Sequence, residues 1–339
     1  MDGWTLQTTA PAVSFNAKPH MSDPQPAILP PLADYLEASS QRFASCISAL
    51  DEGAVVEGVQ AETTMHFVKF DPTSKEPRFD ELAKALARHV VEFCLSARTR
   101  EKIRQMPNAE TELFMRARDY FRKVEDAGDV GELLLFFLLE AALGAPQIVC
   151  KMELKTNSND EVKGADGIHV RWDETDDHLD VLLGEAKLYQ GIGAAMDSTL
   201  KSIKEFHEER RVDQELHLAT AHFKHLDEDF QRRVSGFINR ESDGDEYHII
   251  HACLIGWDWT QYKRLADERD QLFDEFEAKY QSYCGNIGDL LGRRFDDYPF
   301  RHLSFHFIFL PFSSVREFRR SFYRELLGTD LPSSKVDKE

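Results

Sequence analysis

Hydrophobic and polar residues alternate along this chain with two different periods, which divide it into helices and strands. Apolar residues three or four positions apart, among them Leu82, Leu86, Val90 and Phe93, predict a helix over residues 79–97. The same period predicts further helices at residues 35–50, 110–124, 196–211, 266–283 and 314–327.

The middle of the chain combines a strongly apolar helix with several strands. The helix is predicted at residues 130–143 and is closed by Gly144 and Pro146. Period-2 alternation and runs of β-branched and aromatic residues predict strands at residues 63–70, 148–154, 165–172, 179–188, 248–257 and 302–312. A turn is expected at residues 157–160 and a polar hairpin connection at 173–178. This order of elements predicts an α/β fold in which a mixed sheet is flanked by helices.

The chain is expected to be one α/β unit with elaborations at both ends. Residues 1–32 contain six prolines without sustained periodicity, which is typical of a flexible tail. Residues 33–125 are interpreted as an N-terminal elaboration and residues 126–330 as the core with its C-terminal helix. Residues 331–339 would form a second tail.

The composition indicates a soluble protein with a sizeable core. The chain has 339 residues, 42% of them hydrophobic, enough for one large core or two modest ones. Its longest apolar stretch, residues 133–145, is interrupted by Glu140 and is shorter than the roughly 20 residues that span a membrane. The N-terminus lacks a secretory signal pattern, so a cytoplasmic location is expected. Five dispersed cysteines without CxxC spacing indicate neither a disulfide framework nor a zinc cluster.

The charge balance argues against a broad nucleic-acid-binding surface. There are 41 Lys and Arg residues against 60 Asp and Glu residues, a formal net charge of −19. Such a protein repels phosphate at long range. Binding of DNA would therefore need a local basic surface or a partner that delivers the nucleic acid.

Two charged residues stand out on the strand predicted at residues 179–188. Side chains alternate between the faces of a strand, so Val181 and Leu183 share one face with Glu185 and Lys187. The apolar pair would lie in the core, and the charged pair would emerge where the strand leaves it, about 7 Å apart along the strand. Charged groups on an otherwise apolar face need partners or a metal.

Asp166 is expected to meet this pair across the predicted hairpin. It lies next to Gly164 and Gly167 at the start of its strand, and that start is expected opposite the end of the following strand. Asp166 and Glu185 would then converge with room for water. Mg²⁺ prefers such hard oxygen ligands, with phosphate filling the rest of its shell.

Glu132 offers a third carboxylate at the start of the apolar helix, on the side that packs against the sheet. As a hypothesis, Asp166 and Glu185 hold one or two Mg²⁺ ions, and Glu132 assists directly or through water. Lys187 would orient the attacking water and offset negative charge as the phosphodiester is displaced.

Each of these motifs also has an explanation that involves no chemistry. Asp129 and Glu132 have the spacing of a capping box, a common helix start. Asp166 could be a turn residue between glycines. The spacing of Glu185 and Lys187 is common at solvated strand ends. Only the three motifs in combination favour a site.

Three segments, GELLLFFLLE, GADGIHV and LLGEAKLY, resemble in order and spacing the HamA nuclease-subunit family of Hachiman antiphage systems, within the PD-(D/E)XK superfamily. The similarity extends from about Thr63 to the C-terminal helix and is strongest from Glu132 to Tyr189, with Ala165 in place of the superfamily's usual proline. The resemblance implies a restriction-endonuclease-like core and a deoxyribonuclease that uses Mg²⁺, or Mn²⁺, and works with a superfamily 2 helicase subunit, HamB. The active-site residues that it implies are Glu132, Asp166, Glu185 and Lys187.

A helicase partner would also explain the acidity of the chain, because the partner can engage and feed the DNA. The nuclease would then need only a local positive surface. The candidate DNA-binding residues lie on the last predicted helix and after the catalytic strands: Arg316, Arg319, Arg320, Arg324, Lys201 and Lys204.

Two other functions stay open. The chain could be a non-catalytic adaptor that keeps the fold to bind the helicase, although the complete set of carboxylates and lysine counts against this. It could also be a stand-alone restriction-type endonuclease, against which the charge of −19 counts. No G-x-x-x-x-G-K-[ST] loop occurs, so no nucleotide cofactor is expected in this chain.

The histidines are not expected to bind metal. His217, His222 and His225 do not fit an H-E-x-x-H pattern. His248 and His251 should fall on opposite faces of a strand, which argues against chelation.

Overall fold

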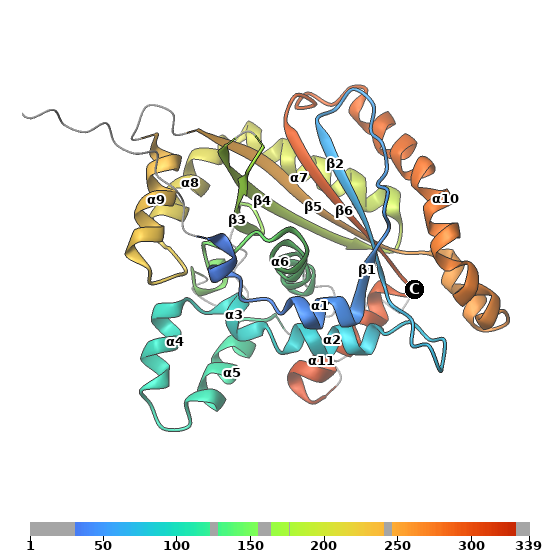
Figure 1. Ribbon diagram of the computed structural model, residues 1–339, viewed down its shortest axis with the longest axis horizontal. Coiled ribbons are helices and arrows are strands. Elements are labelled where there is room, and N and C mark those ends of the chain that lie inside the picture. Colours follow the sequence, from blue (N-terminus) through green and yellow to red (C-terminus); the bar gives the residue numbers. More distant parts are fainter. Residues whose placement is uncertain (1–30, 123–127, 155–163, 176, 241–245, 330–339) are drawn as a thin grey trace, which may run out of the picture.

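A curled sheet of six strands forms the centre of the protein (Figure 1). The computed structural model describes residues 31–122, 128–154, 164–175, 177–240 and 246–329. The strand order is β1-β2-β6-β5-β4-β3, with the inner strands parallel and the edge strands β1 and β3 antiparallel to their neighbours. The strands are Ile47–Ala49 (β1), Ala61–Val68 (β2), Gly167–Asp173 (β3), His178–Tyr189 (β4), Tyr247–Asp258 (β5) and Ser304–Phe312 (β6). The predicted α/β fold with a mixed sheet is confirmed.

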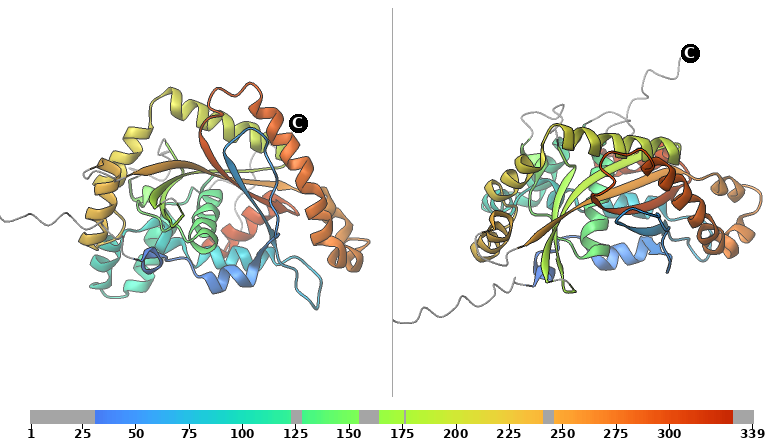
Figure 2. Two further views of the ribbon diagram at one scale, coloured as in Figure 1. Left: turned by 45° about the horizontal axis from the view of Figure 1, so that its top comes forward. Right: turned by 90° about the horizontal axis from the view of Figure 1, so that it is seen from above.

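Helices cover both faces of this sheet (Figures 1 and 2). One layer consists of Ser40–Cys46 (α1), Phe79–Ala87 (α2), Val90–Cys94 (α3), Ala97–Arg104 (α4), Ala109–Asp119 (α5), Asp129–Leu143 (α6) and Val315–Leu327 (α11). The other layer consists of Ile192–Glu208 (α7), Val212–Ala221 (α8), Glu228–Asn239 (α9) and Arg269–Phe295 (α10). Short 3₁₀ turns occur at Leu32–Tyr35 (η1), Lys151–Leu154 (η2) and Thr260–Leu265 (η3).

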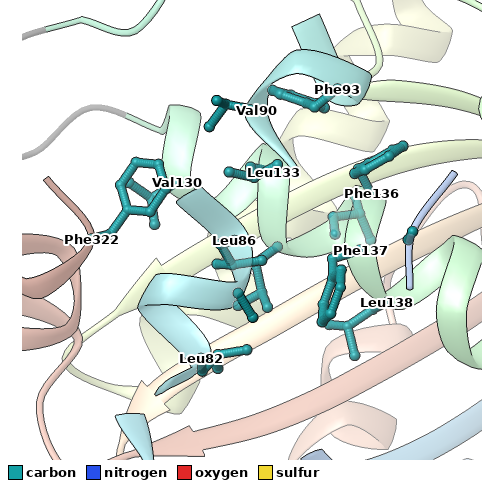
Figure 3. Packing of buried hydrophobic residues seen from close by; sticks show 14 of the residues in the cluster. Leu82, Leu86, Val90, Phe93, Val130, Leu133, Phe136, Phe137, Leu138 and Phe322 are labelled. Atoms are coloured by element: carbon teal, nitrogen blue, oxygen red, sulfur yellow. The ribbon is translucent and has the colours of Figure 1, made fainter. Parts of the chain in front are cut away.

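α6 is apolar nearly all round because neighbours cover almost every side of it. Val130, Leu133, Phe136 and Phe137 on α6 are almost completely buried. They pack with residues of α2, α3 and α11 (Figure 3), namely Leu82, Leu86, Val90, Phe93 and Phe322. Burial of each such side chain contributes about 1.5–3 kcal/mol, so α6 is held firmly among these helices. The helix ends at Leu143 and is capped by Gly144, whose φ of 62° is the left-handed conformation that glycine adopts without strain.

The opposite face of the sheet is also buried beneath helices. Val181 and Leu183 on β4 pack against α8 and α9, whereas Ile255 on β5 and Phe307 on β6 pack against α7 and α10. Strands that are buried on both faces carry near-continuous apolar runs, which explains the composition of β5 and β6.

The predicted strand at residues 148–154 is wrong. The backbone N–H of Ile148 still donates to the carbonyl of Ile168, at 2.9 Å, but the chain then turns into η2. Lys151 accounts for the turn, because its buried ammonium group contacts Glu215 Oε2 at 3.0 Å and the carbonyl of Ala165. A regular strand would not bring that side chain inward to these partners.

Two predicted helices are divided. Residues 79–97 form α2 and α3, interrupted at His89, whose Nδ1 lies 2.7 Å from the Ala85 carbonyl while its Nε2 accepts from the N–H of Ser39 at 3.1 Å. Residues 35–50 hold α1 and β1 instead of one helix.

Most other predicted elements are confirmed within a few residues. α10 continues to Phe295, well beyond the predicted end at 283, and α4, α8 and α9 were not predicted. The turn predicted at 157–160 and nearly all of both predicted tails lie outside the described residues.

The segments on either side of the predicted boundary at residues 125 and 126 share one sheet. β1 and β2 come from the first segment, and β2 pairs with β6 of the second over Ala61↔Phe305 to Met65↔Phe309. The division into an N-terminal elaboration and a core stays a prediction. In the part of the chain that the structure describes, no helix is long and apolar enough to cross a membrane.

Candidate functional site

A cleft of about 1190 Å³ opens along β4 where β3 stops pairing with it. β3 pairs with β4 as far as Gly167↔Gly184, so residues 185–189 of β4 continue beside β5 alone. The lining comes mainly from α6, η2, β4, α7, α11 and the segment before β3, with further residues from β5 and from the connections after α5 and α7. The cleft therefore exposes the end of β4 that carries the predicted site.

Asp166 is fixed at the edge of β4. Its backbone N–H donates to the carbonyl of Gly184 at 2.7 Å, and its Oδ2 accepts from the N–H of Ala186 at 2.8 Å. The carboxylate thus sits beside Glu185, as the hairpin argument predicts. Glycine at 184 also matters for α6, because a Cβ there would lie 2.8 Å from Leu135 Cδ2.

Glu185 is held in an unfavourable environment for a negative charge. The residue is 8% exposed. Burial raises the pKa of its carboxyl group, and the charge of Asp166 raises it further, so that the pKa reaches about 7 although Lys187 and a hydrogen bond with Ser202 lower it. Two carboxylates that disfavour each other's charge form a site that a cation would stabilise.

Lys187 lies beside Glu185, with its Nζ 2.6 Å from Glu185 Oε1. Burial would lower the pKa of Lys187, but the charges of Glu185 and Asp166 outweigh burial and hold it above its usual value. Its ammonium group therefore stays charged at neutral pH and faces the cleft.

Glu132 lines the same cleft from α6. α6 begins at Asp129, so Gly128 is the N-cap residue, and the Asp129 carboxylate accepts hydrogen bonds from the backbone N–H and the Nε of Arg122. The capping-box explanation for the Asp129 and Glu132 pair is wrong. A Cβ at Gly131 would lie 3.4 Å from Ala186 Cβ, which shows how closely α6 approaches β4 beside this site.

A buried ion pair next to Asp166 was missed by the sequence reasoning. Lys151 and Glu215 are 6% and 4% exposed, and Lys151 also donates to the carbonyl of Ala165, the residue before Asp166. Gly164 has φ of 119°, and a Cβ there would collide with Glu215. Together these contacts fix the backbone that presents Asp166. The glycine at 164 was the only signal, because Lys151 was assigned to a strand.

The candidate DNA-binding residues divide into two groups. Arg316 and Arg319 line the cleft, together with Arg122 and Arg211, which were not predicted. The other four are not among the residues that line the cleft: Lys201, Lys204, Arg320 and Arg324. Of these, the first three form ion pairs with Glu205, Glu208 and Glu317, at 3.7, 3.7 and 2.9 Å. Basic side chains do gather in the cleft of this acidic protein, and the DNA-binding role of all six residues stays a prediction.

The arrangement brings three carboxylates and a lysine into one open cleft. Asp166, Glu185 and Glu132 offer oxygen ligands suited to Mg²⁺, and Lys187 offers a cation that could hold water or a phosphoryl oxygen. The neighbouring arginines could contact phosphates.

Comparison with known proteins gives a match to a family model but none to a curated protein. A family model matches residues 46–326, which is most of the length of the chain and includes every element from β1 to α11 apart from the last residue of α11. The family is HamA, whose members are components of Hachiman antiviral defence systems, and the chain belongs to it.

Proposed function

We propose that this chain is the metal-dependent DNA nuclease subunit of a two-component antiphage defence complex, and that a superfamily 2 helicase, HamB, assists it. The observation that carries the proposal is the convergence of Asp166 with Glu185 and Lys187 at the free end of β4. Membership of the HamA family supports the defence setting.

The electrostatic repulsion between Asp166 and Glu185 suits the binding of a divalent cation. The pKa of Glu185 is raised by burial and by the charge of Asp166, and a bound cation would remove that repulsion. Asp166 and Glu185 would hold Mg²⁺, and Glu132 would assist from α6. When bound, Mg²⁺ would supply charge stabilisation to the phosphoryl oxygens and lower the pKa of water.

The chain's own residues would then perform three tasks. The N–H of Ala186 holds the Asp166 carboxylate in one orientation, at 2.8 Å. Lys187 would donate hydrogen bonds to the attacking water and offset negative charge as the phosphodiester breaks. Arg122, Arg316 and Arg319 would contact the DNA backbone along the cleft.

The net charge of −19 favours a helicase-dependent enzyme. An acidic surface repels DNA at long range, so the basic lining of the cleft would act only on a strand that a partner has already brought close. The same reasoning disfavours a stand-alone endonuclease.

The test is cleavage of plasmid DNA by the purified chain with its helicase partner, ATP and Mg²⁺. We expect Glu185→Ala and Lys187→Ala to reduce the cleavage rate by at least about 100-fold. Glu101→Ala and Lys102→Ala, which remove the same side-chain types from exposed positions of α4, should leave the rate unchanged. Complex formation and ATP hydrolysis should be equal in all variants. Undiminished cleavage by Glu185→Ala or Lys187→Ala would overturn the site assignment.

A further inference from the structure

A second cluster of metal-ligating side chains lies at the other end of β4, away from the cleft. His178 and Asp180 come from the start of β4, and His248 comes from the start of β5. One nitrogen or oxygen from each of the three residues lies within 4.8 Å of the other two. Seven residues of strand separate His178 from Glu185, roughly 23 Å at the usual rise, so the two sites are distinct.

The register of the sheet explains why these residues meet. Asp180 pairs directly with His248 on the neighbouring parallel strand, and His178 is two positions before Asp180 on the same strand. All three side chains therefore project from one face. The rings of His178 and His248 lie 3.8 Å apart between centroids. His248 does face away from His251, as predicted, but its partner is His178, 70 positions earlier in the sequence.

The Asp180 carboxylate is oriented toward the histidines. Its Oδ2 accepts two hydrogen bonds from Arg171, from Nη2 at 2.8 Å and from Nε at 3.1 Å. Its Oδ1 lies 3.0 Å from His178 Nε2. An ionised carboxylate can only accept, so the Nε2 nitrogen carries the shared proton in the absence of a metal. Arg171 thus fixes one oxygen and leaves the other directed at the pair of rings.

We propose that His178, Asp180 and His248 form a binding site for Zn²⁺ or a similar first-row transition-metal ion. Zinc binds imidazole nitrogen and carboxylate oxygen at about 2.0–2.2 Å in tetrahedral geometry, which places neighbouring ligand atoms about 3.3 Å apart. The 3.0 Å separation of His178 Nε2 and Asp180 Oδ1 is close to that value, so the ion could replace the proton that these two groups share with little movement of either. The His248 ligand atom lies within 4.8 Å of both. The imidazole ligands select a transition metal over Mg²⁺.

Burial and charge suit this ligand set. His178 and Asp180 are 5% and 1% exposed, so two ligands are already ordered before the ion arrives. His248 is exposed, which gives the ion a path from solvent and leaves room for water as a fourth ligand. Arg171 balances the negative charge of Asp180. A second carboxylate lies beside the same arginine, because Glu62 Oε2 is 3.9 Å from Arg171 Nη1, so the positive charge of Arg171 is shared between two carboxylates.

The bound ion would link the β3–β4 hairpin to β5, because its ligands come from β4 and β5. Of the three ligands, His178 lies where the hairpin closes, opposite Asp173, and His248 lies on the next strand. A ligand that binds only the folded state stabilises it, so the site would stabilise this end of the sheet. The inference is independent of the nuclease proposal, because no residue of the cleft takes part.

The experiment uses the full chain without an affinity tag, stripped of metal with EDTA and then freed of the chelator. Zn²⁺ is titrated in competition with a chromophoric zinc chelator, and Co²⁺ serves as a spectroscopic probe of tetrahedral coordination. We expect one high-affinity ion per chain, visible d–d bands with Co²⁺ and a higher melting temperature with Zn²⁺. His248→Ala should weaken the affinity by at least about 10-fold, and Asp180→Asn should do the same.

His217→Ala is the matched control, because His217 is also an exposed histidine, on α8, and it should bind Zn²⁺ like the wild type. Since His248 is exposed, its replacement should not unfold the protein, and circular dichroism verifies this. Glu185→Gln should retain Zn²⁺ binding, which separates this site from the carboxylates of the cleft. Equal Zn²⁺ affinity in His248→Ala, loss of binding in Glu185→Gln, or no binding by the wild type at 100-fold excess over the protein would each overturn the proposal.

Discussion

Replacement of Glu185 by glutamine should stabilise the metal-free protein while it abolishes cleavage. Glu185 is 8% exposed and its pKa is raised from 4.5 to about 7, by burial first and by the charge of Asp166 second. The ionised carboxylate is therefore less stable in the folded protein than in the unfolded chain. Glutamine has nearly the same shape and carries no charge, so it removes this penalty.

The magnitude follows from the pKa. Each pH unit of difference between the folded and unfolded pKa corresponds to about 1.4 kcal/mol, so a pKa moved from 4.5 to about 7 costs about 3 kcal/mol of unfolding free energy above pH 7. Because the folded pKa is raised, the penalty is absent well below pH 4.5, grows between pH 4.5 and about 7, and is constant above that. Glutamine loses part of the contact with Lys187, so we expect a net gain of about 1–3 kcal/mol at pH 8.

The assay is urea denaturation in EDTA, followed by tryptophan fluorescence and circular dichroism. Wild type, Glu185→Gln and the exposed control Glu101→Gln are compared at pH 8 and pH 5. The gain of Glu185→Gln should be present at pH 8 and largely absent at pH 5, while the control shows no change. A Glu185→Gln variant less stable than wild type at pH 8, or a gain that is the same at both pH values, would refute the reasoning.

Three further predictions concern the surroundings of the site. Lys151→Ala should lower the unfolding free energy by about 3–5 kcal/mol, since Glu215 would stay buried without its partner; Lys151→Met with Glu215→Leu should recover much of that loss in urea denaturation. Gly184→Ala should cost about 1–3 kcal/mol and reduce cleavage, because the new Cβ would lie 2.8 Å from Leu135 Cδ2 and displace α6 from β4; a variant as stable and active as wild type would contradict the close approach. Burial lowers the pKa of His169 to about 3, so folded stability is lost as the pH falls below the unfolded value of about 6.5. Relative to His169→Gln, wild type should lose about 2 kcal/mol between pH 7.5 and pH 5.

Local sequence signals were sufficient to predict the strands that carry the candidate site. Alternation along β4 placed Glu185 and Lys187 on one face, and the hairpin rule placed Asp166 opposite the end of that strand. Both conclusions need only the period of a strand and the short connection between β3 and β4. The hydrogen bond from the N–H of Ala186 to Asp166 Oδ2 agrees with that geometry.

Contacts between distant segments were not predictable in the same way. Lys151 and Glu215 lie 64 positions apart, and neither belongs to a pattern that points to the other. Because Lys151 forms this ion pair, residues 151–154 adopt the 3₁₀ turn η2 and not the strand that their alternation of apolar and polar residues predicts. The meeting of His178 with His248 likewise depends on the pairing of β4 with β5, which a single sequence does not specify.

The most direct test of the account is calorimetric titration of the purified chain with Mg²⁺. If Asp166 and Glu185 are the central ligands, as proposed, the wild type should bind one or two ions, and Asp166→Asn should bind them at least about 10-fold more weakly. Glu101→Gln serves as the control and should match the wild type. Absence of Mg²⁺ binding in the wild type, or equal binding in Asp166→Asn, would contradict the claim that these carboxylates form a metal-dependent nuclease site.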